Sequence, residues 1–328
     1  MKFTLVTGAT GFLGKHLVRE LRRTHPEDGV RVLCHRTSLW DQDPGIETVR
    51  GDITRSEDVL IAAEGVSEIY HLAGIVSRNP GDHELLYRTH IDGTHNICEA
   101  SLRHKVEKVV VVSSSGTVAV SREAVAHNED SGFKTELVAE WPYYLSKIFA
   151  ERLVLDYVRR HGVPIVILNP SLVLGPGDDH QSSTGDIALF LRGQIMAIPR
   201  GGLSFVDVRD AVAGLISAMR RGRVGERYLL GSANWPFREL IENVARLCGR
   251  RPPRFQPSLE WSLLSARLLR RLFPLVGKQF ELDDASIKMA SCFWYCDTRK
   301  ARAELEFRTR DPVSTLRDTV EDLRGRGG

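Results

Sequence analysis

The stretch Thr7-Gly8-Ala9-Thr10-Gly11-Phe12-Leu13-Gly14 follows an apolar run, Phe3–Thr7, and opens an amphipathic segment, Phe12–Thr24. Glycines at the turn between a strand and a helix allow a tight bend and let a pyrophosphate approach the backbone. The N–H groups and the dipole at the start of the helix then attract its charge. The stretch therefore predicts a dinucleotide-binding turn, with contacts from Gly8, Thr10, Gly11, Phe12, Leu13 and Gly14.

The first half of the chain alternates short β-branched runs with segments of helical period, which is typical of a parallel sheet covered by helices. We expect an α/β fold with a doubly wound sheet of the Rossmann type. The predicted strands are Phe3–Thr7, Val30–Cys34, Glu47–Arg50, Glu68–Leu72, Val109–Ser113 and Pro164–Leu168. The predicted helices are Phe12–Thr24, Ser56–Glu64, His83–His104, Tyr143–His161, Val208–Arg221 and Phe237–Cys248.

Beyond Leu168 this alternation weakens, and breakers such as Gly175-Pro176-Gly177 appear. A further strand, Glu226–Gly231, is expected to return to the sheet. We therefore predict two interleaved regions. Residues 1–168 plus about 204–232 form the dinucleotide-binding domain, and residues 169–203 plus 233–328 form a smaller substrate-binding region.

The segment Ser258–Val276 repeats leucine at helical spacing. It is interpreted as a helix packed on the core or on a dimer partner. The alternatives are a lid over an apolar substrate and a contact with a membrane surface.

Composition restricts the function classes. The 328 residues carry a net charge of +3, with basic and acidic residues mixed along the chain, which gives no indication of a nucleic acid or an anionic membrane as partner. Five scattered cysteines favour neither a disulfide framework nor a metal site. Since the N-terminal stretch lacks the pattern of a signal peptide and no integral membrane segment is evident, a cytoplasmic location is expected.

Two further segments end predicted strands on the edge where open α/β sheets bind ligands. Asp52 and Ile53 follow the third strand, and Asp52 is placed to accept a hydrogen bond from an adenine amine. The segment Leu72-Ala73-Gly74 follows the fourth strand. The second strand ends without the carboxylate that usually binds the ribose of NAD, and His35 with Arg36 stands there instead. The sequence therefore favours NADP(H) over NAD(H).

The segment Tyr143-Tyr144-Leu145-Ser146-Lys147 contains Y-x-x-x-K, which places Tyr143 and Lys147 one turn apart on a helix. A phenol with an ordinary pKa near 10 is a poor acid or base at neutral pH, and a neighbouring lysine cation stabilises its phenolate. The run Ser113-Ser114-Ser115 ends the fifth strand on the same edge and offers a hydroxyl to a carbonyl oxygen. A surface pair, with Ser113 and Ser114 as turn caps, is the alternative.

With these motifs the chain resembles the extended short-chain dehydrogenases/reductases, of the epimerase/dehydratase, dihydroflavonol-4-reductase-like and hopanoid-associated sugar epimerase-like group. The resemblance implies that Ser115, Tyr143 and Lys147 are catalytic and that the last two also contact the cofactor. It also places Pro170, in Asn169-Pro170-Ser171, beside the cofactor. Family members often dimerise through the two long helices, so a homodimer is possible.

Two departures from the family pattern concern the site. His90 stands where members usually carry the asparagine of N-V-x-G-T, and Leu203-Ser204 replaces the R-D of many sugar-nucleotide enzymes. We therefore favour an NAD(P)H-dependent reductase or dehydrogenase of a small or apolar carbonyl compound, without a metal. The alternatives are a nucleotide-sugar epimerase or dehydratase that retains NAD, and a non-catalytic dinucleotide-binding regulator.

Overall fold

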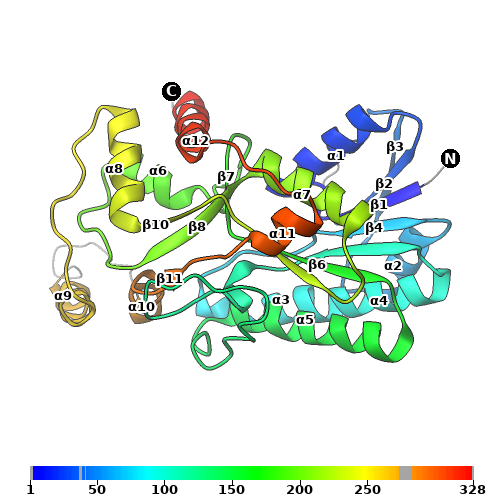
Figure 1. Ribbon diagram of the computed structural model, residues 1–328, viewed down its shortest axis with the longest axis horizontal. Coiled ribbons are helices and arrows are strands. Elements are labelled where there is room, and N and C mark those ends of the chain that lie inside the picture. The colour runs from blue at the N-terminus through cyan, green and yellow to red at the C-terminus, as the bar shows by residue number, and fades with distance from the viewer. Residues whose placement is uncertain (1–2, 37–38, 41, 273–282, 327–328) are drawn as a thin grey trace.

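A computed structural model describes residues 3–36, 39–40, 42–272 and 283–326 (Figure 1). Its main feature is a parallel seven-stranded sheet in the order β3-β2-β1-β4-β5-β6-β9. The chain runs outward from β1 to β3 and then restarts on the other side of β1 with β4, so the order reverses there. The strands are β1 Phe3–Thr7, β2 Gly29–Cys34, β3 Ile46–Arg50, β4 Glu68–His71, β5 Lys108–Val112, β6 Ile165–Pro170 and β9 Arg227–Leu230.

Helices cover both faces of this sheet, which confirms the predicted doubly wound fold (Figure 1). Helices α1 (Phe12–Thr24), α7 (Val208–Arg221) and α11 (Arg299–Glu304) pack on one face. Helices α2 (Ser56–Ala63), α4 (Gly93–His104) and α5 (Pro142–His161) pack on the other. Because both faces are buried, inner strands such as β5 and β6 are mostly apolar rather than alternating.

The predicted helix His83–His104 is three elements in the structure. The 3₁₀ turn η1 (Pro80–Asp82) leads into α3 (His83–Tyr87), a π-helical turn η2 (Arg88–Asp92) and then α4. A π turn is rare and is found mostly at functional sites. This one carries the buried His90, which replaces the family asparagine.

A second sheet is built around β8 (Gly202–Asp207). Strand β10 (Ala233–Pro236) pairs with β8 antiparallel, and β7 (Leu172–Leu174) and β11 (Phe293–Trp294) pair with it in parallel. Helices α6 (Gly185–Leu191), α8 (Phe237–Cys248) and α12 (Pro312–Arg326) share a core with this sheet. Strand β9 joins the large sheet as expected, whereas the division of the chain into two domains stays a prediction.

The leucine-rich segment forms α9 (Leu259–Leu272), followed by α10 (Asp284–Ala290), and residues 273–276 of the predicted helix lie outside the described ranges. Leu264 and Leu268 are exposed, so these two leucines do not pack on the core of this chain, and packing on a dimer partner stays a prediction. Within the described ranges, no helix has the length and apolarity needed to cross a bilayer.

Candidate active site

The glycine turn lies against the end of β4. Gly8 has a φ of 71°, and a Cβ there would stand 2.7 Å from both the Leu72 carbonyl carbon and the Ala73 nitrogen. A Cβ on Gly14 would stand 2.1 Å from the Gly8 carbonyl oxygen. Both positions therefore require glycine, since a side chain on Gly8 would separate the turn from Leu72-Ala73 and one on Gly14 would push the start of α1 away from Gly8.

A neutral histidine holds these two segments together. Within hydrogen-bond distance of the buried His71 lie the hydroxyls of Thr7 (2.8 Å from Nδ1) and Thr94 (3.1 Å from Nε2). The Thr7 hydroxyl also accepts the N–H of Ala73 at 3.2 Å. Burial lowers the pKa of His71 to about 3, so this bridge keeps its uncharged form at neutral pH.

The start of α1 fits a pyrophosphate. Gly11 is the N-cap, no side chain caps the helix, and the first turn holds no acidic residue. The N–H groups of the first turn, at Phe12, Leu13 and Gly14, have no partner inside an α-helix. An anion at this end would meet these donors and the positive end of the helix dipole, as the glycine pattern predicts.

The predicted adenosine-side residues follow the next two strands of the same edge. His35 and Arg36 are exposed at the end of β2, and Asp52 follows β3 with one carboxylate oxygen 3.6 Å from His35 Nε2. The other Asp52 oxygen accepts the N–H and the hydroxyl of Thr54, each at 2.9 Å. The Ile53 carbonyl accepts from Asn96 Nδ2 at 2.9 Å. Their contacts with a cofactor stay predictions.

Tyr143 and Lys147 lie one turn apart on α5 and face the carboxyl ends of β4 and β5. Lys147 Nζ donates to the Val112 carbonyl at the end of β5 at 3.1 Å, and a Cβ on Gly74 would be 3.3 Å from this nitrogen. The side chains of Tyr143 and Ser114 are hydrogen-bonded. The structure thus brings the tyrosine, the lysine, a serine and the β4 loop together.

Burial acts on both ionisable groups. It raises the pKa of Tyr143 to about 12, and the hydrogen bond with Ser114 opposes that rise. It lowers the pKa of Lys147 to about 8, and the negative charge of Glu151 opposes that fall. Tyr143 is therefore a protonated phenol at neutral pH, beside a lysine that is mostly charged.

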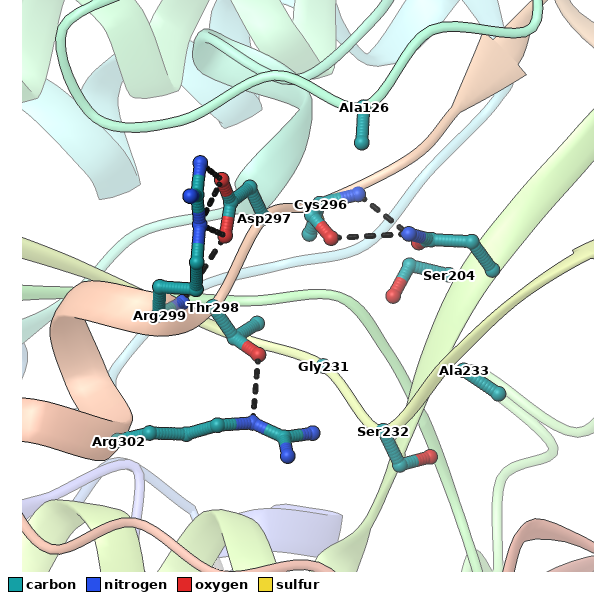
Figure 2. Close-up of a pocket in the computed structure, with 11 residues that line it drawn as sticks. Ala126, Ser204, Gly231, Ser232, Ala233, Cys296, Asp297, Thr298, Arg299 and Arg302 are labelled. Carbon is teal, nitrogen blue, oxygen red and sulfur yellow. Dashed lines mark hydrogen bonds and ion pairs between the residues drawn. The ribbon is translucent and has the colours of Figure 1, made fainter.

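The hydroxyls of Ser114 and Ser115 have different partners. Ser114 caps the 3₁₀ turn η3 (Ser115–Thr117), and the Ser115 hydroxyl is hydrogen-bonded with the buried thiol of Cys296. Cys296 lines a cavity of about 340 Å³ together with Ser204, Asn234 and Arg302 (Figure 2). The assignment of Ser115 as catalytic stays a prediction, and the contacts favour Ser114.

His90 links the catalytic helix to the β4 loop. The N–H of Ile75 donates to Nε2 at 3.1 Å, so Nδ1 carries the proton of the neutral ring and donates to the Ser146 hydroxyl at 2.8 Å. Ser146 in turn donates to the Tyr143 carbonyl at 2.8 Å. Burial lowers the pKa of His90 to about 2. The imidazole therefore bridges the loop and the catalytic helix at the position of the family asparagine.

Glu151, which the sequence analysis missed, is the centre of a buried network one turn beyond Lys147. It is 1% exposed. Its Oε2 lies 3.0 Å from an Arg227 nitrogen, and its Oε1 accepts from Ser113 (2.5 Å), Thr117 (2.8 Å) and Asn169 (2.7 Å). The network ties α5 to the ends of β5 and β6, where the buried Pro170 is the last residue.

Aromatic side chains from helix α5 and strand β11 of the second sheet lie beside Tyr143. The rings of Tyr143 and Tyr144 are 5.0 Å apart, and Tyr144 stacks on Trp294 at 4.6 Å. Leu203 on β8 stands where many sugar-nucleotide enzymes have arginine. Its register partners on the two neighbouring strands are Trp235 of β10 and Trp294 of β11. The surroundings of this position are therefore apolar.

The sheet order, the glycine turn and the Tyr143–Lys147 pair define an oxidoreductase-type enzyme that uses a nicotinamide dinucleotide. The family model "NAD dependent epimerase/dehydratase family" matches residues 4–231. The chain belongs to this family, and with it to the extended short-chain dehydrogenases/reductases.

Several relatives are named reductases or dehydrogenases. A putative dihydroflavonol 4-reductase of Synechocystis sp. is 31% identical over 97% of this chain and 92% of its own length. Sterol demethylase protein B of Methylococcus capsulatus is 31% identical over 99% of each chain. Human 3 beta-hydroxysteroid dehydrogenase type 7 is 31% identical over 53% of this chain and 50% of its own. The chain is therefore an enzyme rather than a non-catalytic dinucleotide-binding regulator.

Solved structures support the fold. The crystal structure of gox2253 has a TM-score of 0.86 at 29% identity and covers 100% of this chain and 99% of its own. A dTDP-glucose 4,6-dehydratase of Streptomyces venezuelae, solved with NAD and TYD bound, has a TM-score of 0.79 over 99% of this chain and 98% of its own. It is 23% identical, so it shows a shared Rossmann-type fold only.

Proposed function

We propose that this enzyme reduces a ketone of an apolar metabolite, or oxidises the corresponding alcohol, with NADP(H) favoured over NAD(H). The observation that carries the proposal is the Tyr143–Lys147–Ser114 cluster at the carboxyl edge of the sheet, beside the loop that ends in Gly74. A panel of ketones, alcohols and sugar nucleotides, assayed for a net change in reduced cofactor, tests it.

A dinucleotide held at the glycine turn and beside Tyr143 and Lys147 would supply a hydride to the carbonyl carbon, or accept one from the alcohol. As the C=O π bond breaks, its electron pair moves to oxygen, and the Tyr143 O–H bond breaks to deliver the proton there. The Lys147 cation stabilises the phenolate left behind, which regains its proton from solvent. A serine hydroxyl donates to the same oxygen and orients it.

An apolar substrate is supported by the surroundings of Tyr143. Tyr144 and Trp294 lie beside it, and Leu203 stands between two tryptophans where a sugar-nucleotide enzyme often has arginine. We assign substrate binding to residues 169–203 and 233–328. The relatives named for dihydroflavonol and hydroxysteroid compounds are consistent with an apolar substrate.

Arg36→Ala is expected to raise the Kd for NADPH at least about tenfold and to leave the Kd for NADH unchanged, because a charge-assisted hydrogen bond contributes roughly 1.5–3 kcal/mol. Fluorescence titration with both cofactors measures the two constants. Arg103→Ala removes another exposed arginine, on α4, and serves as the control. Equal losses for both cofactors in the Arg36 variant would refute the NADP assignment.

Ser114→Ala is expected to lower kcat/KM about 10²-fold, the typical loss when one donor to a developing oxyanion is removed. Ser115→Ala, whose hydroxyl contacts Cys296 instead, is expected to change it by less than about tenfold. Steady-state kinetics of both variants decide between the two serines. The opposite ranking would restore Ser115 as the serine that orients the substrate.

The competing proposal is a nucleotide-sugar epimerase or dehydratase. Such an enzyme recycles its NAD, so the purified protein would contain oxidised cofactor and would show no net cofactor turnover. A homodimer through α4 and α5 is compatible with either function, and light scattering tests it.

A further inference from the structure

Helix α9 presents an apolar stripe on its outer side. Trp261, Leu264 and Leu268 are 66%, 59% and 55% exposed. They are spaced three and four residues apart, so they lie along one side of the helix. Ala266, which is 2% exposed, faces the protein on the opposite side. Three large apolar side chains are thus exposed in a row.

Two further large apolar side chains are exposed in other segments of the same region. Phe255, four residues ahead of α9, is 65% exposed, and its carbonyl accepts the N–H of Ile198 at 2.9 Å. Met196, two residues before Ile198, is 72% exposed. Figure 1 places α9 beside α10 at the edge of the molecule, away from the large sheet. No described element covers this side of the helix.

The same segment has a strong local charge. Residues 250–272 contain six arginines and one acidic residue, Glu260, a net charge of +5. Asp284 pairs with two of the arginines, Arg267 and Arg270. The remaining four form no ion pair with any described residue: Arg250, Arg251, Arg254 and Arg271. The net charge of the whole chain, +3, conceals this cluster.

We propose that α9 and the arginines that flank it dock the enzyme on the surface of an anionic lipid bilayer. A helix that exposes Trp and Leu along one side and has Arg residues beside and ahead of that side can lie in the interface, with the exposed apolar side chains among the acyl chains. Basic residues next to it attract anionic headgroups, and tryptophan favours this interface. A second copy would bring two positive surfaces together, so the charge argues against self-association.

Docking would bring the enzyme to the phase in which an apolar carbonyl compound dissolves. That consequence rests on the proposed function. Binding to lipid does not rest on the proposed function, because it is measured on vesicles without substrate or cofactor. The docking proposal and the proposed function can therefore fail separately.

The test is co-sedimentation of the full chain with vesicles of phosphatidylcholine alone, or mixed with phosphatidylglycerol. We expect binding to the mixed vesicles only, weakening as salt is added. The variant Trp261→Ser/Leu264→Ser/Leu268→Ser should bind at least about tenfold more weakly. The variant Arg250→Gln/Arg251→Gln/Arg254→Gln should also lose at least about tenfold, since each arginine contributes about fivefold.

The matched control is Ile61→Ser/Val224→Ser, which removes two exposed apolar side chains elsewhere, 62% and 49% exposed, and should bind like the wild type. Trp261 is the most exposed tryptophan among the described residues, so its emission should shift to the blue on docking. Trp261→Phe should remove that shift, which also controls for misfolding.

Failure of the wild type to bind mixed vesicles, or unchanged binding by the triple serine variant, would overturn the proposal. So would a wild-type dimer that the triple serine variant converts to a monomer in light scattering, because the stripe would then bind a second copy.

Discussion

Replacing Tyr143 with phenylalanine is expected to lower kcat by about 10³-fold, within the range that general acid catalysis supplies. In the proposed mechanism the phenol exchanges a proton with the substrate oxygen, and it is protonated at neutral pH because burial raises the pKa of Tyr143 to about 12. Phenylalanine keeps the ring and removes only the hydroxyl. Cofactor affinity should therefore be retained, since the glycine turn is untouched.

Steady-state kinetics and cofactor titration measure these two effects separately. The control is Tyr87→Phe on α3, whose ring lies 6.0 Å from Phe149 and keeps that contact without its hydroxyl. It should retain wild-type turnover. A Tyr143→Phe enzyme with more than about a tenth of wild-type kcat would exclude the phenol as the proton donor.

Replacing Glu151 with alanine is expected to lower the free energy of unfolding by about 3–5 kcal/mol, the usual loss when one partner of a buried ion pair is removed. Arg227, whose side chain is 12% exposed, would keep its charge without the carboxylate. The hydroxyls of Ser113 and Thr117 and the amide of Asn169 would lose their acceptor. Denaturant unfolding measures the loss.

The control for stability is Glu140→Ala, which breaks an ion pair with Lys288 in which the glutamate side chain is 59% exposed. The Glu140→Ala substitution should lower the free energy of unfolding by no more than about 1 kcal/mol. Equal losses in the two variants would mean that the Glu151 network adds nothing to stability.

Glu151→Gln tests the electrostatic role of the same residue. The charge of Glu151 raises the pKa of Lys147, which burial lowers to about 8. Removing that charge lowers the pKa of Lys147 further, so less of the cation remains at a given alkaline pH. The rate of carbonyl reduction by the Glu151→Gln variant should therefore begin to fall at a pH about one unit lower than that of the wild type. An unmoved profile would leave Glu151 with a structural role only.

The parts of the site that follow from local sequence could be predicted. Gly8 and Gly14 occupy positions that glycine alone satisfies. The spacing of Tyr143 and Lys147 places both on the same side of any helix. The strands of the large sheet could also be predicted, because their apolar runs are a property of the local sequence. Their ends moved by one or two residues, as helix and strand ends commonly do.

The rest depends on tertiary contacts that local spacing does not encode. His90 reaches its partners only because the π turn η2 positions it. Glu151 reaches its partners only where β5 and β6 end beside α5. One signal for Glu151 was present: a carboxylate one turn after Lys147, on the same side of α5. Strands as short as β7 and β11 are too short to show an alternation of apolar and polar residues in the sequence. Which serine bonds with Tyr143 depends on the 3₁₀ turn after Ser114.

The proposed reaction is net hydride transfer between a nicotinamide cofactor and a carbonyl carbon, with the proton from Tyr143. The most direct measurement is a reaction with NADPH deuterated at nicotinamide C4, followed by mass spectrometry of the product and absorbance of the cofactor. We predict one deuterium on the new carbinol carbon and one NADPH consumed for each product formed. Product formation without net cofactor consumption or deuterium transfer would contradict the account and favour an epimerase or dehydratase.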